Sequence, residues 1–291
     1  MKARSLLFDL WGDYIQHVAD EVSSSTLATL MAPFGVSESA MRQAVSRTVR
    51  QGWLQSRRVG GRSNYSLTPN GQKRITVASR RVYNPEERHW DGFWRVLSYS
   101  VPEDLRERRD DLRRELVWTG FGPLAPGLWI SPNPLEEAAL DLIRRYDLAP
   151  YVHLFRATHV GPHSAQELVA SCWDLRGIAE HYQRFIEGWL PRLQAQADRI
   201  ELDDVGCYVE RLSLVHEYRK FLFVDPGLPA GLLPSEWLGD DARRLFQMYY
   251  ALLAPGALRY LDRVAGLNDD KGVAFDVQTG RSLPEAGDPA E

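Results

Sequence analysis

The sequence predicts an α+β protein, and three observations support this class. Apolar residues recur every three or four positions in the first 80 residues and again from about residue 164, which is the helical period. Between residues 90 and 160, segments of strand character alternate with segments of helical character. Near residue 60, two glycines separate two short strand-like segments, as in a tight hairpin. At 291 residues the chain is long for one domain, so two or three are expected.

Residues 1–82 are predicted to form a DNA-binding domain of short helices and one hairpin. Helices are expected over residues 5–18, 25–32, 38–51 and 68–81, and strands over residues 53–59 and 62–67. Residues 33–35 break the second helix, and Ser37 can cap the third by accepting a backbone N–H. Gly60 and Gly61 supply the positive φ angles of the hairpin turn. This order of elements predicts a winged helix-turn-helix.

The helix expected over residues 38–51 has two chemically different faces. One face is apolar and carries Met41, Ala44, Val45, Thr48 and Val49. The other is rich in hydrogen-bond donors and is expected to hold no acid; it carries Ser39, Arg42, Gln43, Ser46, Arg47 and Arg50. Arginine pairs with guanine and glutamine with adenine in the major groove, so Arg42, Gln43 and Arg47 are predicted to read bases. The remaining polar residues are predicted to position the phosphate backbone, together with the hairpin arginines Arg57, Arg58 and Arg62.

The charge of the chain is unevenly distributed. The whole chain carries a net charge of −4, which alone argues against a nucleic-acid binder. Residues 1–82, however, hold 12 Lys/Arg and five Asp/Glu, whereas the remainder holds 23 basic and 34 acidic residues. A basic module attached to an acidic body is expected when one domain meets phosphate and the rest has another task. The alternative is a surface helix that happens to be rich in arginine.

Residues 90–160 are predicted to form a ferredoxin-like α/β sandwich after a linker near residues 83–89. Strands are expected over residues 94–101, 121–131 and 151–158, the second of which can form a pair, with helices over residues 103–117 and 135–146. Residues 164–266 are predicted to be a mainly helical C-terminal domain, and residues 267–291 a loose tail. Its helices are expected over residues 173–193, 205–223, 241–253 and 255–264.

Several classes of function are disfavoured by the sequence. No stretch approaches the ~20 uncharged apolar residues of a membrane helix, so no membrane partner is expected. Cys172 and Cys207 are too few for a disulfide framework, which favours a reducing cytoplasm. His159 and His163 lie four residues apart in a Gly/Pro loop without a third ligand, so no metal site is predicted. Nucleotide-binding glycine loops and nucleophile elbows are absent from the sequence, and neither a cofactor nor a catalytic residue is expected.

An ordered set of short motifs runs from about residue 5 to residue 265. The N-terminal motifs are Gly35-Val36-Ser37, Arg42, Ser46-Arg47, Gly52-Trp53-Leu54, Gly61-Arg62, Tyr65 and Leu67-Thr68-Pro69-Asn70-Gly71. The central motifs are Trp118-Thr119-Gly120-Phe121-Gly122 and Gly127-Leu128-Trp129-Ile130-Ser131-Pro132. The C-terminal motifs are Trp173-Asp174-Leu175, His216-Glu217-Tyr218-Arg219-Lys220-Phe221, Asp225-Pro226, Leu228-Pro229, Leu232-Leu233-Pro234 and Trp237. In this order they resemble the PaaX-like transcriptional repressors, which control bacterial phenylacetate degradation.

This resemblance implies a cytoplasmic homodimer that binds double-stranded operator DNA. It also implies release from the operator by an aryl-CoA thioester, typically phenylacetyl-CoA. The central region is similar to the small ferredoxin-like nucleases of CRISPR systems, and a nucleic-acid-processing nuclease is therefore the alternative function. However, the first strand ends at Ser100, where such a nuclease would need a metal-binding aspartate. A regulator that is not an enzyme is therefore predicted, with a winged-helix protein-interaction module as a third reading.

The sequence offers five candidate residues for binding the effector. Trp173 and Tyr182 could line an aromatic pocket, although aromatic residues at helical spacing more often form core. Arg219 and Lys220 could bind the phosphates of the effector. His216 could touch a phosphate or carboxylate, or it could form a structural ion pair with Glu217 or Glu210.

Overall fold

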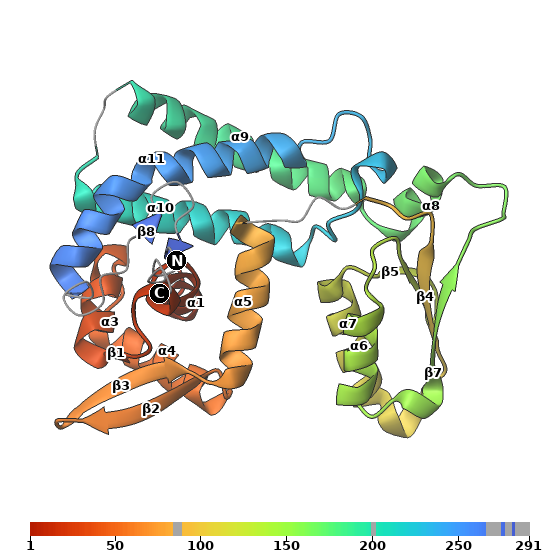
Figure 1. The fold of residues 1–291 in the computed structure, drawn as a ribbon, viewed down its shortest axis with the longest axis horizontal. Coiled ribbons are helices and arrows are strands. Elements are labelled where there is room, and N and C mark those ends of the chain that lie inside the picture. The colour runs from red at the N-terminus through yellow and green to blue at the C-terminus, as the bar shows by residue number, and fades with distance from the viewer. Residues whose placement is uncertain (84–88, 199–201, 266–274, 277–280, 283–291) are drawn as a thin grey trace, which may run out of the picture. The chain divides into compact units, whose positions relative to one another are not determined.

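The computed structural model describes residues 1–83, 89–198, 202–265, 275–276 and 281–282. The chain forms two compact units, which are described separately. Unit 1 consists of residues 1–85, 185–219 and 241–291, and unit 2 consists of residues 86–184 and 220–240. The protein is of mixed α+β class, with one three-stranded and one four-stranded antiparallel sheet and a largely helical C-terminal region (Figure 1). Among the described helices, none is long and apolar enough to cross a membrane.

The N-terminal part of unit 1 contains the elements expected for residues 1–82. The helices are α1 (Ala3–Leu10), the π-helical turn η1 (Trp11–Ile15), α2 (Gln16–Val18), α3 (Ser24–Met31), the 3₁₀ turn η2 (Ala32–Phe34), α4 (Glu38–Arg50) and α5 (Pro69–Tyr83). The strands are β1 (Val22–Ser23), β2 (Leu54–Val59) and β3 (Arg62–Leu67), in the sheet order β1-β3-β2. Ser37 caps α4 as predicted, because its hydroxyl accepts the backbone N–H of Ala40 at 3.2 Å.

The β2–β3 hairpin is closed by a two-residue turn. Val59 pairs with Arg62, and between them Gly60 and Gly61 have φ angles of +55° and +78°. Two successive positive φ angles match the right-handed twist of the flanking strands, and glycine reaches them without the strain of a Cβ atom. The predicted hairpin turn is therefore confirmed.

Replacing Gly61 with valine is expected to destabilise unit 1 by about 1–2 kcal/mol, because a side chain at positive φ is strained and β-branching increases the strain. Urea denaturation measures the loss. Gly188 is a matched control: it lies in a helix at negative φ with open space around its Cα. Gly188→Ala should be neutral or slightly stabilising. Equal losses in the two variants would contradict the role of the turn.

Unit 2 is built around a four-stranded antiparallel sheet with the order β5-β6-β4-β7. Its strands are β4 (Trp94–Tyr99), β5 (Gly122–Ala125), β6 (Leu128–Ser131) and β7 (Val152–Ala157). Along the chain, α6 (Arg106–Thr119) and α7 (Glu136–Arg145) connect them in a βαββαβ arrangement. Leu97 and Trp129 pack with α6 and α7 on one face, whereas Trp94 and Ile130 pack with α8 (Ala165–Cys172) on the other. The predicted second strand region is thus a hairpin, formed by β5 and β6.

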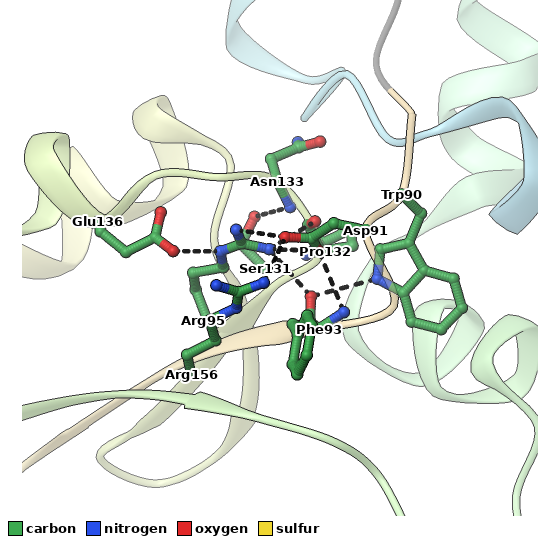
Figure 2. Close-up of polar contacts among 9 residues, drawn as sticks. All are labelled: Trp90, Asp91, Phe93, Arg95, Ser131, Pro132, Asn133, Glu136 and Arg156. Carbon is green, nitrogen blue, oxygen red and sulfur yellow. Dashed lines mark hydrogen bonds and ion pairs between the residues drawn. The ribbon is translucent and has the colours of Figure 1, made fainter.

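A buried arginine joins three segments of unit 2. The side chain of Arg95 on β4 is 3% exposed and donates to both carboxylate oxygens of Asp91, at 2.7 and 2.8 Å. On its other side it donates to Glu136, in the first turn of α7, at 2.8 Å. Figure 2 shows the guanidinium between these carboxylates, with Arg156 also reaching Asp91. These hydrogen bonds lower the pKa of Asp91, so the network stays ionised at neutral pH.

Replacing Arg95 with methionine is expected to destabilise unit 2 by about 1.5–3 kcal/mol, the range for hydrogen bonds to charged groups, because the guanidinium is buried but the two carboxylates left behind are each 38% exposed. Thermal denaturation measures the loss. Arg144→Met is the matched control, since the exposed pair of Arg144 with Asp141 contributes at most about 1 kcal/mol. Because the pKa of Asp91 is lowered in the folded state, its contribution is present above pH ~4 and lost in more acidic solution. The difference between wild type and Arg95→Met should therefore shrink on acidification, and a constant difference would contradict this account.

The C-terminal region is helical, with two departures from prediction. Its main helices are α9 (Leu175–Ala197), α10 (Asp204–Tyr218) followed by the 3₁₀ segment η5 (Arg219–Phe223), and α11 (Gly239–Ala265). The predicted break before Pro255 is wrong, since α11 continues through it. Leu253, Ala254 and Ala257 are buried, and this packing outweighs the hydrogen bond that proline removes.

The additional helix α8 precedes α9, and the short 3₁₀ turn η6 (Ala230–Leu232) lies in the loop before α11. The tail predicted for residues 267–291 lies outside the described residues, except for the two-residue strands β8 (Phe275–Asp276) and β9 (Arg281–Ser282).

Candidate nucleic-acid interface

Helix α4 presents the two faces that its sequence predicts. Met41, Ala44, Val45 and Thr48 are buried, and the Thr48 hydroxyl donates to the carbonyl of Ala44 at 2.8 Å. The polar side chains of the opposite face are all exposed: Ser39, Arg42, Gln43, Ser46, Arg47 and Arg50. The buried face fixes the helix on unit 1, and the whole donor-rich face is left open to a partner.

The hairpin adds three exposed arginines beyond the end of α4. Side chains alternate along a strand, so Arg57 and Val59 share one face of the hairpin and Arg58 lies on the other. Arg62 pairs with Val59 and therefore joins the face of Arg57. Two faces of the hairpin can thus meet phosphate groups, with Arg57 and Arg62 on one and Arg58 on the other.

Two carboxylates lie beside these basic residues. Glu38 pairs with Arg42, so the expectation of a face without acid is wrong at the first turn of α4; residues four apart in a helix share a face. Glu21 accepts hydrogen bonds from Arg57 at 2.8 Å and from Asn64 at 3.0 Å, and the bond from Arg57 lowers the pKa of Glu21. Both arginines are more than 60% exposed, so these pairs contribute little stability, and phosphate can compete for them.

Three of the five candidate effector residues lie in unit 2. Trp173 packs under Gly122, where an added Cβ atom would come within 2.5 Å of its ring. Tyr182 is buried; its ring stacks on Phe221 with centroids 4.0 Å apart, and its hydroxyl donates to Asp225. Lys220 also belongs to this unit. Trp173 and Tyr182 thus pack against different residues of one unit.

His216 and Arg219 lie together in unit 1 and share one buried partner, Asp9 of α1. The Nδ1 atom of His216 is 2.8 Å from Asp9, Arg219 forms an ion pair with the same carboxylate, and Arg219 Nη2 also donates to the carbonyl of Ser5 at 3.4 Å. The sequence suggested Glu217 or Glu210 as the partner of His216 in a structural ion pair. Both choices are wrong, because the partner is Asp9. The residue that pairs with it lies 207 positions earlier in the chain.

A second buried polar cluster lies in the core of unit 1, and sequence reasoning missed it. This tyrosine–arginine cluster consists of Asp13, Tyr14, Tyr83, Arg211 and Tyr250. Arg211 is fully buried; it donates to the Tyr14 hydroxyl at 3.1 Å and lies 3.8 Å from the centre of the Tyr250 ring. Tyr83 and Tyr250 both donate to Asp13, at 2.9 and 2.5 Å. Burial raises the pKa of Tyr14, so its phenol remains protonated at neutral pH.

The tyrosine–arginine cluster connects four helical segments of unit 1. Asp13 and Tyr14 come from η1, Tyr83 from the end of α5, Arg211 from α10 and Tyr250 from α11. The N-terminal elements η1 and α5 are therefore joined to the C-terminal helices α10 and α11 by buried charge and hydrogen bonds. The sequence did contain one signal for this cluster: Asp13 is an acidic residue that lies one helical turn after Asp9 within an apolar stripe.

Within the part of the chain that the structure describes, no cluster of three or more His, Cys, Asp or Glu side chains is suited to hold a metal ion. Ser100 follows the end of β4 and is exposed. At the opposite end of the same strand, Asp91 and Glu136 are engaged by Arg95.

Comparison with known proteins identifies the family. Three family models match consecutive parts of the chain: the PaaX-like protein model over residues 2–71, the PaaX protein central Cas2-like domain over residues 87–169, and the PaaX-like protein C-terminal domain over residues 173–263. The transcriptional repressor PaaX of Escherichia coli (strain K12) is 33% identical over 264 residues, covering 88% of this chain and 82% of that protein. The chain belongs to the PaaX family.

The resemblance seen in the motifs is thereby confirmed. Among solved structures, an uncharacterised protein from Mycobacterium tuberculosis matches with a TM-score of 0.55 at 27% identity, covering 88% of this chain and 97% of the other. The PaaX-like N-terminal match contains α1 to α4 and the hairpin, which carry every predicted DNA-binding residue. As a relative of a transcriptional repressor, this PaaX-family chain is grouped with regulators rather than with enzymes.

Proposed function

We propose that this protein is a transcriptional repressor that binds operator DNA through a winged helix-turn-helix. In this arrangement α3 and α4 form the helix-turn-helix and the β2–β3 hairpin is the wing. The observation that carries the proposal is the exposed face of α4, which bears Arg42, Gln43 and Arg47 while its opposite face is buried. An α-helix fits the major groove, and these side chains match the donor and acceptor pattern of base edges.

The remaining predicted residues would contact the backbone. Ser39, Ser46 and Arg50 flank the reading residues on α4, and Arg57, Arg58 and Arg62 extend the basic surface along the wing. Phosphate contacts from such residues fix the register of the helix without reading sequence. We propose that the sheet of unit 2 belongs to a ferredoxin-like sandwich that is separate from the DNA reader; the strand order β5-β6-β4-β7 and the βαββαβ connections support this.

We further propose that the repressor acts as a cytoplasmic homodimer. A two-fold dimer presents two reading helices about one turn of DNA apart, ~34 Å, so the operator should be palindromic. The division into domains at residues 1–82, 90–160 and 164–266 remains part of the proposal. It agrees with the three segments matched by family models, and the tyrosine–arginine cluster supports close packing of the first domain with the helices of the third.

The proposed effector is an aryl-CoA thioester such as phenylacetyl-CoA, and the proposed target is an operon for degrading aromatic acids such as phenylacetate. Family membership is the support for both. Of the candidate residues, Trp173, Tyr182 and Lys220 remain in one unit, whereas His216 and Arg219 are occupied by Asp9. An effector that changes the DNA-binding free energy by ~1–3 kcal/mol is sufficient for release.

Fluorescence anisotropy tests the proposal with labelled DNA from upstream of the gene and of neighbouring catabolic genes. The protein should bind one fragment tightly, release it on addition of phenylacetyl-CoA and retain it with free CoA. Indifference to all fragments would overturn DNA recognition. Release by free CoA alone would overturn the choice of effector, and cleavage of the fragment with divalent metal would favour a nuclease.

A further inference from the structure

A cavity with a volume of about 580 Å³ lies in unit 2. Its walls come from Tyr99 and Ser100 at the end of β4, from the β5–β6 hairpin and from α6. Figure 1 shows α6 and α7 on one face of this sheet, and Trp129, which packs with both helices, forms part of the cavity wall. The volume falls in the range of ~300–1,000 Å³ that is typical of small-molecule sites. None of the five candidate effector residues lines this cavity, so it is a separate site.

The backbone fixes the wall between β4 and the hairpin. The N–H of Tyr99 donates to the carbonyl of Gly127 at 2.8 Å, and an added Cβ atom at Gly127 would lie 2.6 Å from the Tyr99 carbonyl oxygen. The register of β5 against β6 shifts between Pro123 and Ala125, which makes Leu124 the extra residue of a β-bulge. A bulge redirects side chains, and Leu124 lines the cavity. The shape of the cavity is therefore built into the hairpin.

The lining of the cavity combines aromatic and cationic side chains. Trp129 is buried and Tyr99 is half-buried, and both contribute to the wall. Arg109 and Arg113 also line the cavity, and they lie on one face of α6 because they are four residues apart. The residues that line the cavity, all described by the structure, include no carboxylate. Such a lining suits an apolar ring joined to an oxygen acceptor, since a guanidinium only donates hydrogen bonds.

Both arginines can bind a ligand oxygen. Arg109 donates to Glu103 at 3.1 Å, but this carboxylate is 73% exposed. The Nη1 atom of Arg113 is 3.9 Å from Asp110 Oδ1, which is beyond hydrogen-bond distance. Ion pairs with exposed carboxylates contribute little stability, and a guanidinium has five N–H donors. A ligand oxygen can therefore be bound beside these pairs or in place of them.

We propose that this cavity binds the acyl group of an aromatic acid. The ring packs against Trp129 and Tyr99, and the acyl oxygen accepts hydrogen bonds from the two arginines of α6. A free aromatic carboxylate and its CoA thioester present the same ring and oxygen, and the CoA part of the thioester extends past the exposed rim at Ala125. The inference rests on the proposed function, because it gives the proposed effector a binding site in unit 2.

Isothermal titration calorimetry tests the site by adding phenylacetate, phenylacetyl-CoA or free CoA to the full-length protein. Arg113→Gln should weaken binding at least about tenfold, the factor expected for a lost hydrogen bond to a charged group. Ala125→Trp should abolish binding, because the indole fills the cavity from an exposed position. Arg114→Gln is the matched control: Arg114 is the next residue of α6, is 71% exposed, pairs with Asp111 and does not line the cavity. Without ligand, all three variants should melt at the wild-type temperature.

The outcomes separate the site from the proposed function. Binding of phenylacetate identifies the free acid as a ligand, and binding of phenylacetyl-CoA alone identifies the thioester. The site is overturned if the wild type binds neither, if it binds free CoA equally well, if Arg113→Gln or Ala125→Trp binds like the wild type, or if Arg114→Gln weakens binding equally.

DNA binding is measured separately, by anisotropy without ligand, and should be the same in wild type and all three variants. A wild type that binds no DNA fragment but shows the expected pattern of ligand binding would overturn the repressor function and leave the site standing.

Discussion

An Arg211→Ala protein is expected to lose about 3–5 kcal/mol of stability in unit 1. The guanidinium is fully buried between Tyr14 and Tyr250 and interacts electrostatically with Asp13, so its removal takes a positive charge away from a carboxylate buried in the core. Tyr83 and Tyr250 still donate to Asp13, but neutral donors compensate only part of the cost of a buried charge. Chemical denaturation followed by tryptophan fluorescence measures the change in the unfolding midpoint of this unit.

Arg192→Ala is the matched control for Arg211→Ala. Arg192 is 55% exposed and pairs with Glu210, so its loss should cost at most about 1 kcal/mol. A loss below about 1 kcal/mol for Arg211→Ala as well would show that the tyrosine–arginine cluster does not hold the helices of unit 1 together.

An Arg47→Ala protein is expected to lose sequence discrimination while keeping its fold. A bidentate contact between arginine and a base contributes ~1–3 kcal/mol, so operator affinity should fall about 5- to 150-fold with little change on random DNA. Arg47 is exposed and α4 is held by its opposite face, so the melting temperature should stay close to that of the wild type. Anisotropy titrations at fixed salt on both duplexes measure the effect.

The control on the same helix is Arg50→Ala, which removes a residue assigned to the backbone. It should weaken operator and random DNA by the same factor. Operator affinity and discrimination that remain at wild-type values in Arg47→Ala would contradict the assignment of this residue to base reading.

Local sequence patterns predicted the parts of the fold that depend on neighbouring residues. The start of α4 follows from Ser37, the hairpin turn from Gly60 and Gly61, and the strands of unit 2 from short apolar runs between turn residues. The exposed face of α4 could be predicted for the same reason, since helical spacing alone decides which side chains share a face. The pairing of Glu38 with Arg42 was also within reach of this rule and was missed.

Pairings between distant residues could not be predicted in this way. Asp9 and His216 are 207 positions apart, and Tyr14 and Arg211 are 197 apart, so no local period connects them. Helix α11 passes through Pro255 because tertiary burial of its neighbours outweighs a local signal. The proposed effector is likewise not encoded in the spacing of residues, and family membership is the only support for that proposal.

Selection from a library of random duplex DNA tests most directly whether the exposed face of α4 reads sequence. The full-length protein should enrich duplexes that carry two inverted copies of one short motif, with centres about 10 base pairs or a multiple of this apart. A variant with Arg42, Gln43 and Arg47 all replaced by alanine should enrich no motif, although it still binds DNA at low salt. Enrichment of the same motif by this variant, or of none by the wild type, would contradict the account.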